Sequence, residues 1–433
     1  MKKILLSAFI GLATFTFAQE LSLEELDKKE YHKWDEVADV PVDEVYGILF
    51  SMESEIPNNL AQFPNLHKIN LEICPEMNLD LELPKLKQLD HLAVLAISAN
   101  YTDHFPEIIL EFTSLKALEL SGLSEMGDLP EEISQLVNLE RLQLGSGLAG
   151  GIGMTHLPKS IVELPKLKVL FTYYNADFIM DSHVYELPAL EELWVDDVEG
   201  LDLGLLGRSY PRLKFLFLYT FEGTRLEGIE QLTGLEELTM GYSETLQTLD
   251  GLQHLNALRD FTLHVNPNLN KEEEIEHIAK LPNLVKLDLM VARACEKKLN
   301  LPSFGFNSLE DLSVSNRSNI SLKHVLNNVR NMSSLHTLKI DGFKEEKMPA
   351  TLYTLVNIEH LYIYRCSVLE LSSNISNLNL KSLHLFQSDL KKLPAELSRM
   401  KSLEELTLSY TKISDYDAVY LRLKARGIKV EKT

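Results

Sequence analysis

One pattern of apolar residues recurs along most of the chain. Leucine or another apolar residue fills the first, fourth and sixth positions of a six-residue segment, as in Leu115–Leu120, Leu139–Leu144 and Leu213–Leu218. Fifteen such segments begin between Leu66 and Leu403, at steps of 22 to 28 residues. A repeat sustained at this period predicts one elongated stack of similar units, each in contact with its neighbours.

Within each segment, the last two apolar residues are separated by a single residue. That spacing is the period of a β-strand with one buried face. A single unit cannot bury this face alone, so stacking is expected to build a continuous parallel sheet over one long core. We therefore predict an α/β fold: a curved solenoid with the sheet on the concave face and short helical or 3₁₀ segments on the convex face.

The pattern continues beyond the strand as L-x-x-L-x-L-x-x-N/C in five repeats. The last position there holds Cys74, Asn100, Asn175, Asn266 and Cys366. On these residues the chain resembles the leucine-rich-repeat family over about residues 45–413, and the segments 226–229 and 249–252 are similar to the shorter repeats of internalin-type proteins. The resemblance implies a horseshoe-shaped solenoid that binds protein or peptide on its concave face.

The two ends of the chain depart from the repeat. Residues 1–18 have a basic start and a short apolar run, which is typical of a secretory signal and is shorter than the roughly 20 residues of a membrane span. We expect an N-terminal cap at 19–44, a solenoid of about 15–16 repeats at 45–413, and a C-terminal cap at 414–433 with a helix, Gly427 and a last strand. The signal predicts an exported protein of bacterial type, in the periplasm, at the cell surface or secreted, with no membrane span after cleavage.

Charge and cysteine content narrow the classes of partner. The formal net charge is -22, and an acidic surface repels phosphate backbones and anionic membranes, so nucleic acid is not an expected partner. The three cysteines are too far apart in the repeat order to form a disulfide framework. We expect them to be buried, unreactive thiols.

The residues between the strand leucines are predicted to face the concave surface, and three adjacent repeats are rich in aromatic residues there. An exposed aromatic cluster is typical of a binding surface. Glu192 and Asp197 are expected at its rim. Two other interpretations stay open: a loop covers the rings, or the rings pack on one another across strands. The predicted binding patch is Phe171, Tyr173, Tyr174, Trp194, Asp196, Phe215, Phe217 and Tyr219.

A second concave patch is predicted near the C-terminal end, with Tyr410 close by. It mixes rings with cationic groups, so an anionic or peptide partner is expected. Its residues are His360, Tyr362, Tyr364, Arg365, His384 and Phe386.

Sequence motifs give little support for catalysis. The chain has no H-E-x-x-H, G-x-S-x-G or G-K-S/T motif. Residues Gly145–Gly150 fit G-x-G-x-x-G, but no clear helix follows at once and no acidic residue lies at the usual spacing, so a loop is expected. We predict a recognition protein that is not an enzyme and that needs no cofactor or metal. The alternatives are a structural envelope protein and, as a residual, an enzyme acting on peptide or glycan.

Overall fold

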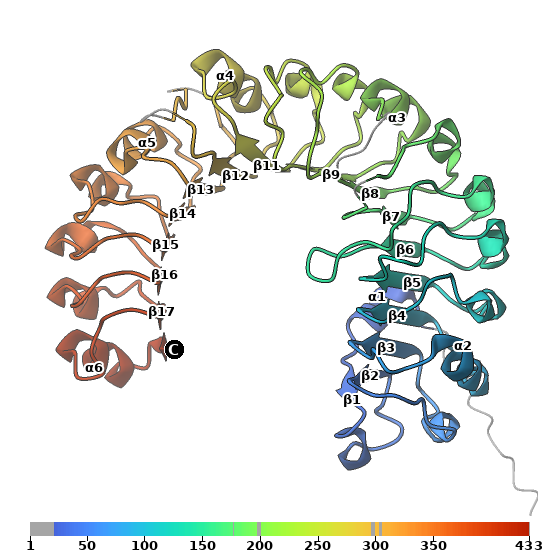
Figure 1. The fold of residues 1–433 in the computed structure, drawn as a ribbon. Helices are drawn as coiled ribbons and strands as arrows, with labels where there is room; N and C mark the ends of the chain where they lie inside the picture. Colours follow the sequence, from blue (N-terminus) through green and yellow to red (C-terminus); the bar gives the residue numbers. More distant parts are fainter. Residues whose placement is uncertain (1–20, 176, 197–200, 296–298, 303–304, 433) are drawn as a thin grey trace, which may run out of the picture.

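The computed structural model describes residues 21–432, apart from 176, 197–200, 296–298 and 303–304. The expected signal at 1–18 lies outside the described residues. The described strands form one 18-stranded sheet, in which each strand pairs in parallel with the next along the chain. Figure 1 shows this sheet lining the inside of an open arc. The curved leucine-rich-repeat solenoid predicted from the sequence is confirmed.

The strands are short, and most begin one residue before the second leucine of a repeat. They are β1 (His32–Lys33), β2 (Gly47–Ser51), β3 (Lys68–Glu72), β4 (Val94–Ser98), β5 (Ala117–Ser121), β6 (Arg141–Leu144), β7 (Val169–Phe171), β8 (Glu192–Val195), β9 (Phe215–Leu218), β10 (Glu237–Met240), β11 (Asp260–Val265), β12 (Lys286–Val291), β13 (Asp311–Asn316), β14 (Thr337–Asp341), β15 (His360–Tyr364), β16 (Ser382–Phe386), β17 (Glu405–Ser409) and β18 (Lys429–Lys432).

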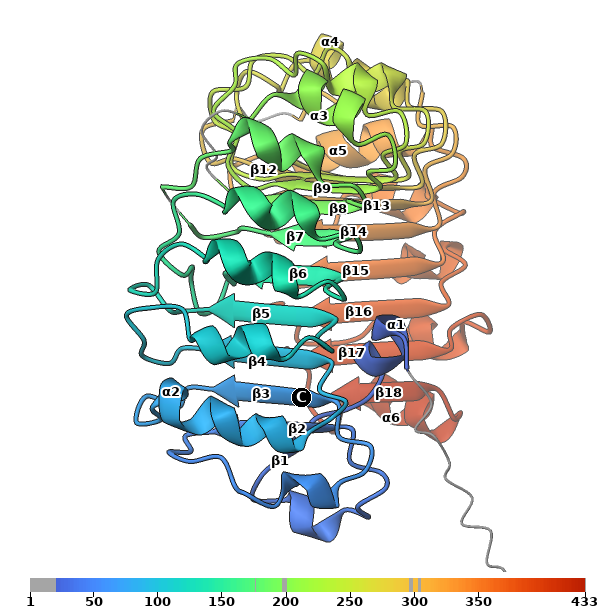
Figure 2. The same cartoon turned by 90° about the vertical axis from the view of Figure 1, so that its right-hand side faces the viewer.

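The helices are short as well, and Figure 2 shows several of them stacked along the outer side of the sheet. The α-helices are α1 (Leu23–Asp27), α2 (Leu79–Glu82), α3 (Leu203–Ser209), α4 (Glu272–Ala279), α5 (Leu322–Val329) and α6 (Ala418–Ala425). The 3₁₀ helices are η1 (Val37–Asp39), η2 (Leu60–Gln62), η3 (Leu83–Gln88), η4 (Glu107–Glu111), η5 (Glu131–Gln135), η6 (Lys159–Glu163), η7 (Ser182–Glu186), η8 (Ile229–Gln231), η9 (Leu252–His254), η10 (Ala350–Thr354), η11 (Ser373–Asn377) and η12 (Ala395–Arg399).

In the register of the sheet, the apolar residues of neighbouring strands pair with one another. Leu216 pairs with Leu238, and Leu238 pairs with Phe261. These side chains are fully buried in one core cluster that runs along the solenoid. Because successive strand residues point to opposite faces, Phe215 and Phe217 face the concave side.

Two kinds of residue start the 3₁₀ helices. Pro130, Pro158 and Pro394 occupy the position before η5, η6 and η12 with φ of -73°, -62° and -63°, close to the value that the proline ring fixes. Gly228 and Gly251 precede η8 and η9 with φ of +87° and +100°, which a residue with a Cβ adopts only with strain. These prolines and glycines therefore set where the five convex segments η5, η6, η8, η9 and η12 begin, whereas η7 and η11 follow Asp181 and Ser372.

The asparagines after the strands satisfy buried backbone groups. Asn175 accepts hydrogen bonds from the amides of Ile152 and Met154 and donates to the carbonyls of Leu144 and Thr172. All three cysteines are buried and free, and burial raises the pKa of Cys295 to about 11 and that of Cys366 to about 12. The expectation of buried thiols is confirmed, and a raised pKa is in line with low reactivity.

The segments at the two ends of the described chain pack on the solenoid in different ways. Trp34 lies 5.5 Å from the ring of Phe50, and Val37 joins the main core, so the segment after β1 packs against the first repeats. The helix α1 lies instead on the sheet face at β4 and β5, where Leu26 packs against Val94. At the other end, α6 begins after Asp417, because the Asp417 carboxylate accepts hydrogen bonds from the backbone amides of Val419 and Tyr420. In the described part of the chain, none of the helices has the length and apolar character needed to cross a bilayer.

Candidate functional site

The predicted aromatic patch is one continuous cluster on the concave face of β7, β8 and β9. The Trp194 ring lies 4.4 Å from that of Phe215 and 4.7 Å from that of Phe217, in stacked orientations. Tyr173 lies 5.4 Å from Phe217 and 5.0 Å from Tyr219, edge to face. The sheet register causes this proximity, because Phe171 pairs with Trp194 and Trp194 with Phe217.

The rings pack on one another, as one of the two alternative interpretations expected. Tyr173 is buried, and burial raises its pKa, as do hydrogen bonds with Tyr174 and Tyr219. The cluster is not fully closed, however, since Trp194, Phe215 and the other strand rings remain partly exposed. Tyr174 is 42% exposed, with its backbone in the left-handed region at φ +68°. The result is a connected, partly exposed aromatic surface on the concave face.

A glycine-rich loop borders this surface on the side of β6. Ser146 and Gly150 form an antiparallel bridge, and Figure 1 shows the loop after β6 projecting into the arc. A Cβ added at Gly147 would lie 3.5 Å from the ring of Tyr173 and 3.6 Å from that of Tyr174, so the loop lies against both rings. Leu148, next in the loop, is fully exposed. The expectation of a loop here is correct, and its apolar Leu148 was missed as part of the site.

The aromatic surface extends past β9 through residues that strand alternation did not point to. Tyr242 follows β10, and its ring lies 5.1 Å from Tyr219 and 4.6 Å from His264. Arg317 donates from Nη1 to the Tyr242 hydroxyl at 2.6 Å and lies over the same ring, 5.7 Å from its centroid. In the sequence, Tyr242 directly follows a glycine just beyond the strand. That was the feature from which its place next to the aromatic surface could have been suspected.

Carboxylates lie beside the rings. Burial raises the pKa of Glu192, and the negative charge of Glu237 adds to that effect. Asp196 accepts a hydrogen bond of 2.8 Å from the Thr220 hydroxyl, which holds it at the edge of the cluster. Asp197, also expected at the rim, lies outside the described residues.

The second predicted patch also forms a connected cluster. Tyr362 and His384 stack at 4.2 Å with nearly parallel rings, and Phe386 lies 5.4 Å from Tyr410. Tyr364 lies 6.0 Å from Phe386. These side chains come from the adjacent strands β15 and β16 and from the residue after β17.

The cationic groups of this second patch are offset by neighbours. Arg365 forms a two-point ion pair with Asp341. Burial lowers the pKa of His384, and His360 hydrogen-bonds through Nδ1 to the Ser382 hydroxyl at 2.8 Å. The positive character expected for an anionic partner is therefore weaker than the residue types suggested.

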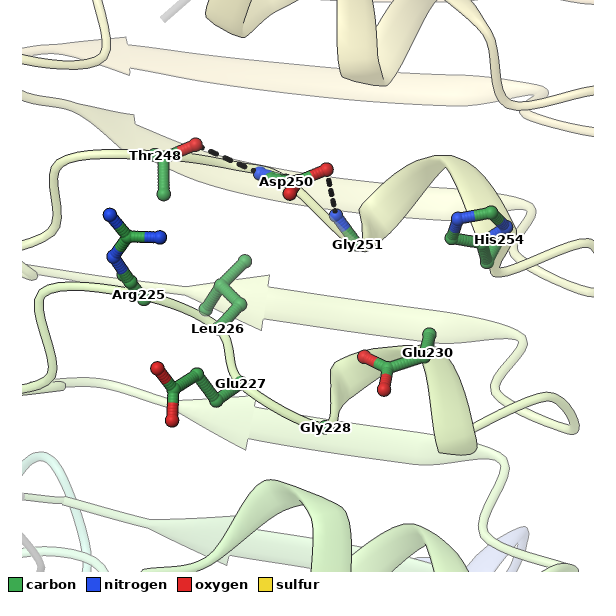
Figure 3. Close-up of a pocket in the computed structure, with 9 residues that line it drawn as sticks. All are labelled: Arg225, Leu226, Glu227, Gly228, Glu230, Thr248, Asp250, Gly251 and His254. Carbon is green, nitrogen blue, oxygen red and sulfur yellow. Dashed lines mark hydrogen bonds between the residues drawn. The ribbon is translucent and has the colours of Figure 1, made fainter.

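Convex-side pockets lie between neighbouring loops. Figure 3 shows a pocket of about 410 Å³ between the segments 225–230 and 248–254, with side chains of both charges around it. Asp250 accepts from the Gly251 amide at 3.0 Å, and its own amide donates to the Thr248 hydroxyl at 3.1 Å. Hydrogen bonding by Gln253 lowers the pKa of Asp250. Asp250 is thus hydrogen-bonded within its own loop and stabilises the conformation of that loop.

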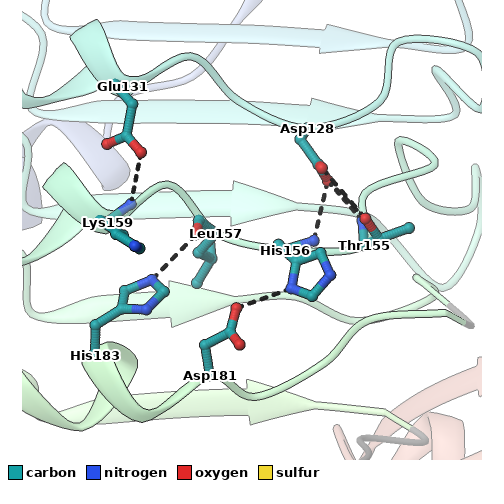
Figure 4. Close-up of polar contacts among 8 residues, drawn as sticks. All are labelled: Asp128, Glu131, Thr155, His156, Leu157, Lys159, Asp181 and His183. Carbon is teal, nitrogen blue, oxygen red and sulfur yellow. Dashed lines mark hydrogen bonds and ion pairs between the residues drawn. The ribbon is translucent and has the colours of Figure 1, made fainter.

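Figure 4 shows polar contacts that tie three successive convex loops together. Asp128 accepts from the amides of Thr155 and His156 at 2.7 and 3.0 Å. The His156 ring bonds through Nδ1 to Asp181 at 2.8 Å, and His183 bonds to the Leu157 carbonyl at 3.1 Å. The Thr155 hydroxyl contacts Asp128 rather than the imidazole, so this cluster does not arrange an activated nucleophile. No group of three or more potential ligands suited to a metal ion is found among the described residues.

The fold is that of a leucine-rich-repeat solenoid, with a cluster of aromatic rings on its concave face. No protein-family model matches the chain. It is similar to the volume-regulated anion channel subunit LRRC8B of Mus musculus, 28% identical over 193 residues, which is 44% of this chain and 23% of that protein. It is also similar to subunit LRRC8D of Rattus norvegicus, 24% identical over 324 residues, or 74% of this chain and 29% of that protein. The chain spans less than a third of the length of these relatives.

Solved structures with a similar course of the chain are also leucine-rich-repeat proteins or receptors. An internalin from Listeria monocytogenes has 19% identity and a TM-score of 0.49, covering 75% of this chain and 92% of that one. A leucine-rich-repeat protein of Leptospira interrogans has 20% identity and a TM-score of 0.48, with coverage of 93% and 99%. The plant peptide hormone receptor RGFR1 in complex with RGF2 has 16% identity and a TM-score of 0.40, with coverage of 86% and 57%.

Proposed function

We propose that the protein is an exported recognition protein that binds a protein or peptide segment on its concave face, at the aromatic surface of β7–β9. One observation carries this proposal: the rings form a rigid cluster on the sheet face opposite the core, with the exposed Leu148 loop beside it. Rigid aromatic anchors next to an exposed apolar side chain are the usual centre of a protein interface. A surface of this kind binds a partner without catalysing a reaction, and no catalytic role is proposed for it.

The occupant is best matched by an extended or helical peptide with apolar side chains. The ring face of Trp194 stacks on the rings of Phe215 and Phe217. The ring edges are therefore the part left for contact with a partner. Ring edges carry partial positive charge and pack well against aliphatic and aromatic side chains. Glu192 and Asp196 at the border suit a partner with nearby hydrogen-bond donors.

The test is a crosslinking capture from cells and culture medium with three baits. The native protein is compared with the double variant Leu148→Asp, Tyr174→Ser, and with Leu81→Asp as a matched control. Leu81 is 69% exposed but lies on α2, away from the aromatic surface. We expect one partner to be captured by the native and Leu81→Asp baits and lost with the double variant. Equal capture by all three baits contradicts the proposed site and favours a scaffold role.

Export is tested separately by intact mass. The full sequence, expressed with residues 1–18, should yield a mature chain that begins at Gln19 outside the cytoplasm. An uncleaved chain recovered from the cytoplasm contradicts this part of the proposal.

A further inference from the structure

Residues 21–31, here called the N-terminal strap, bind across the sheet at β3–β6, next to the aromatic surface. We infer that the groove beneath the strap is a second binding surface, which takes a partner's short helix carrying a leucine followed by a carboxylate, and that the strap occupies it in the free chain. This inference does not depend on what the aromatic surface binds.

The apolar part of the groove is separate from the main core. Leu26 has no exposed surface and packs with Ala93, Val94 and Ala117 in a cluster of its own. Val94 faces away from the core because its strand neighbour Leu95 belongs to the main core. Small side chains on β4 and β5 therefore leave room on the concave face for the buried Leu26, with Leu21 and Leu23 packed beside it.

The polar part of the groove is formed by cations of the sheet. Arg141 binds the Asp27 carboxylate through Nη1 and Nη2, both at 2.9 Å. Lys116 donates to the Leu21 carbonyl at 2.7 Å, and Lys68 donates to the Lys29 carbonyl. A two-point guanidinium–carboxylate contact is directional, so the groove selects an acidic residue next to the leucine. Three cations stand here against the carboxylate of Glu119, which pairs with Arg141 at 2.9 Å. The excess of positive charge, in a chain of net charge -22, gives the groove charge complementarity to such a segment.

The strap is a removable occupant. The helix α1 has five residues and a capping box between Ser22 and Glu25, and a helix of this length is not stable in water without packing. It is therefore expected to unfold when it leaves the sheet, at a lower free energy than the solenoid itself.

An open pocket of about 480 Å³ lies beside the strap, and the strap and the sheet both line it. The pocket is lined by Asp27, Lys29, Glu30, Tyr31, Lys68, Val94, Glu119 and Arg141.

Tethering makes the strap an effective competitor. A segment joined by a short linker has an effective concentration on the order of millimolar. A free partner segment therefore displaces the strap only if its higher affinity for the groove outweighs this effective concentration. Weak ligands therefore do not displace the strap, whereas a partner segment with higher affinity for the groove does.

The probe is a fluorescent peptide with the sequence of residues 21–31, measured by anisotropy against full-length proteins. The Leu26→Glu variant releases the strap, because Leu26 anchors it and takes no part in the main core. We expect this variant to bind the peptide at least about tenfold more tightly than the native protein, in which the groove is occupied. Adding Arg141→Glu should abolish binding, and a peptide with serine in place of the leucine that corresponds to Leu26 should not bind.

Two results overturn the inference: no saturable binding by a Leu26→Glu variant that unfolds at the native temperature, or binding that Arg141→Glu leaves unchanged. If Leu26→Glu fails to fold, Asp27→Lys replaces it, because the Asp27 side chain is 45% exposed and lies outside both apolar clusters. The variant Leu148→Asp, Tyr174→Ser should leave peptide binding unchanged, so failure at one surface is distinguishable from failure at the other.

Discussion

Arg141 and Asp27, 114 residues apart in sequence, meet in a two-point ion pair with both N–O distances at 2.9 Å. The Arg141 side chain is 22% exposed and that of Asp27 is 45% exposed, so solvent screens the pair. Arg141 also binds Glu119, at 2.9 Å. The pair connects β6 to α1 and fixes the N-terminal strap on the sheet.

Asp27→Asn is expected to weaken the docking of the strap by about 0.5–1 kcal/mol, since one partner of a partly exposed pair is neutralised. Hydrogen exchange should detect the weaker docking, because the backbone amides of residues 23–31 exchange faster in the variant. The urea midpoint of the solenoid should stay unchanged. The control is Glu24→Gln, because Glu24 pairs with Lys28 at an exposed position within the strap. A loss of global stability in Asp27→Asn would show that the strap belongs to the main cooperative unit.

Leu238→Asp should destabilise the whole solenoid, whereas Thr239→Asp should not. The two residues are neighbours on β10, but Leu238 is 1% exposed in the core and Thr239 faces the concave side. A carboxylate at 238 is buried without a partner, and the leucine packing is lost, which together cost about 4 kcal/mol or more. A surface change at 239 should stay within about 1 kcal/mol. Urea unfolding followed by circular dichroism measures both, and equal effects would contradict the register of the sheet.

The sequence predicts the fold because the repeat encodes it locally. Each Leu-x-Leu pair fixes which strand face is buried, as with Leu216 and Leu218, and parallel stacking follows since every unit needs a neighbour. The same alternation correctly places Phe171, Trp194 and Phe217 together on the concave face. Binding at this surface stays a prediction, as do the boundaries of the caps.

Other features depend on contacts between distant residues that no periodicity encodes. Arg141 occupies an ordinary variable strand position, so nothing local indicates that it holds Asp27. Tyr242 and Arg317 lie beyond the ends of their strands, where alternation no longer tells which way a side chain points, yet they extend the aromatic surface. Leu148 is exposed only because the glycines around it form a projecting turn.

Asn175→Ala is expected to cost about 2–4 kcal/mol. Asn175 is 2% exposed, and its amide group bonds four backbone groups, including the amide of Ile152 in the loop segment beside the aromatic surface. Alanine leaves these buried groups unsatisfied, which costs roughly 1–3 kcal/mol for each group that water cannot reach. Asn283→Ala is the matched control, since Asn283 is exposed and makes a single bond to the Asn256 carbonyl. Urea unfolding should separate the two variants, and equal midpoints would contradict the bracing role of Asn175.

Asp288 is a partly buried carboxylate on the concave side of β12. Among the described residues its Oδ1 atom has no hydrogen-bond partner, although a hydrogen bond with Ser313 acts to lower its pKa. Burial raises the pKa of Asp288, and the charge of Asp311 on β13 adds to the shift. Lys339 does not offset this fully, because it pairs with Asp311 at 2.7 Å.

The direction of the pH dependence follows from this raised pKa. The unfolded chain gives up the Asp288 proton at lower pH than the folded chain does, so the favourable contribution at acidic pH is lost as pH rises through the folded pKa. Asp288→Asn removes the charge, and the variant should have a higher urea midpoint than the native protein at pH 7. The difference should shrink as pH falls toward about 4, near the ordinary range of aspartate. The exposed Asp43→Asn serves as control and should match the native protein throughout. A gap that is absent at pH 7, or that widens on acidification, would mean that Asp288 is well solvated or paired in the folded chain.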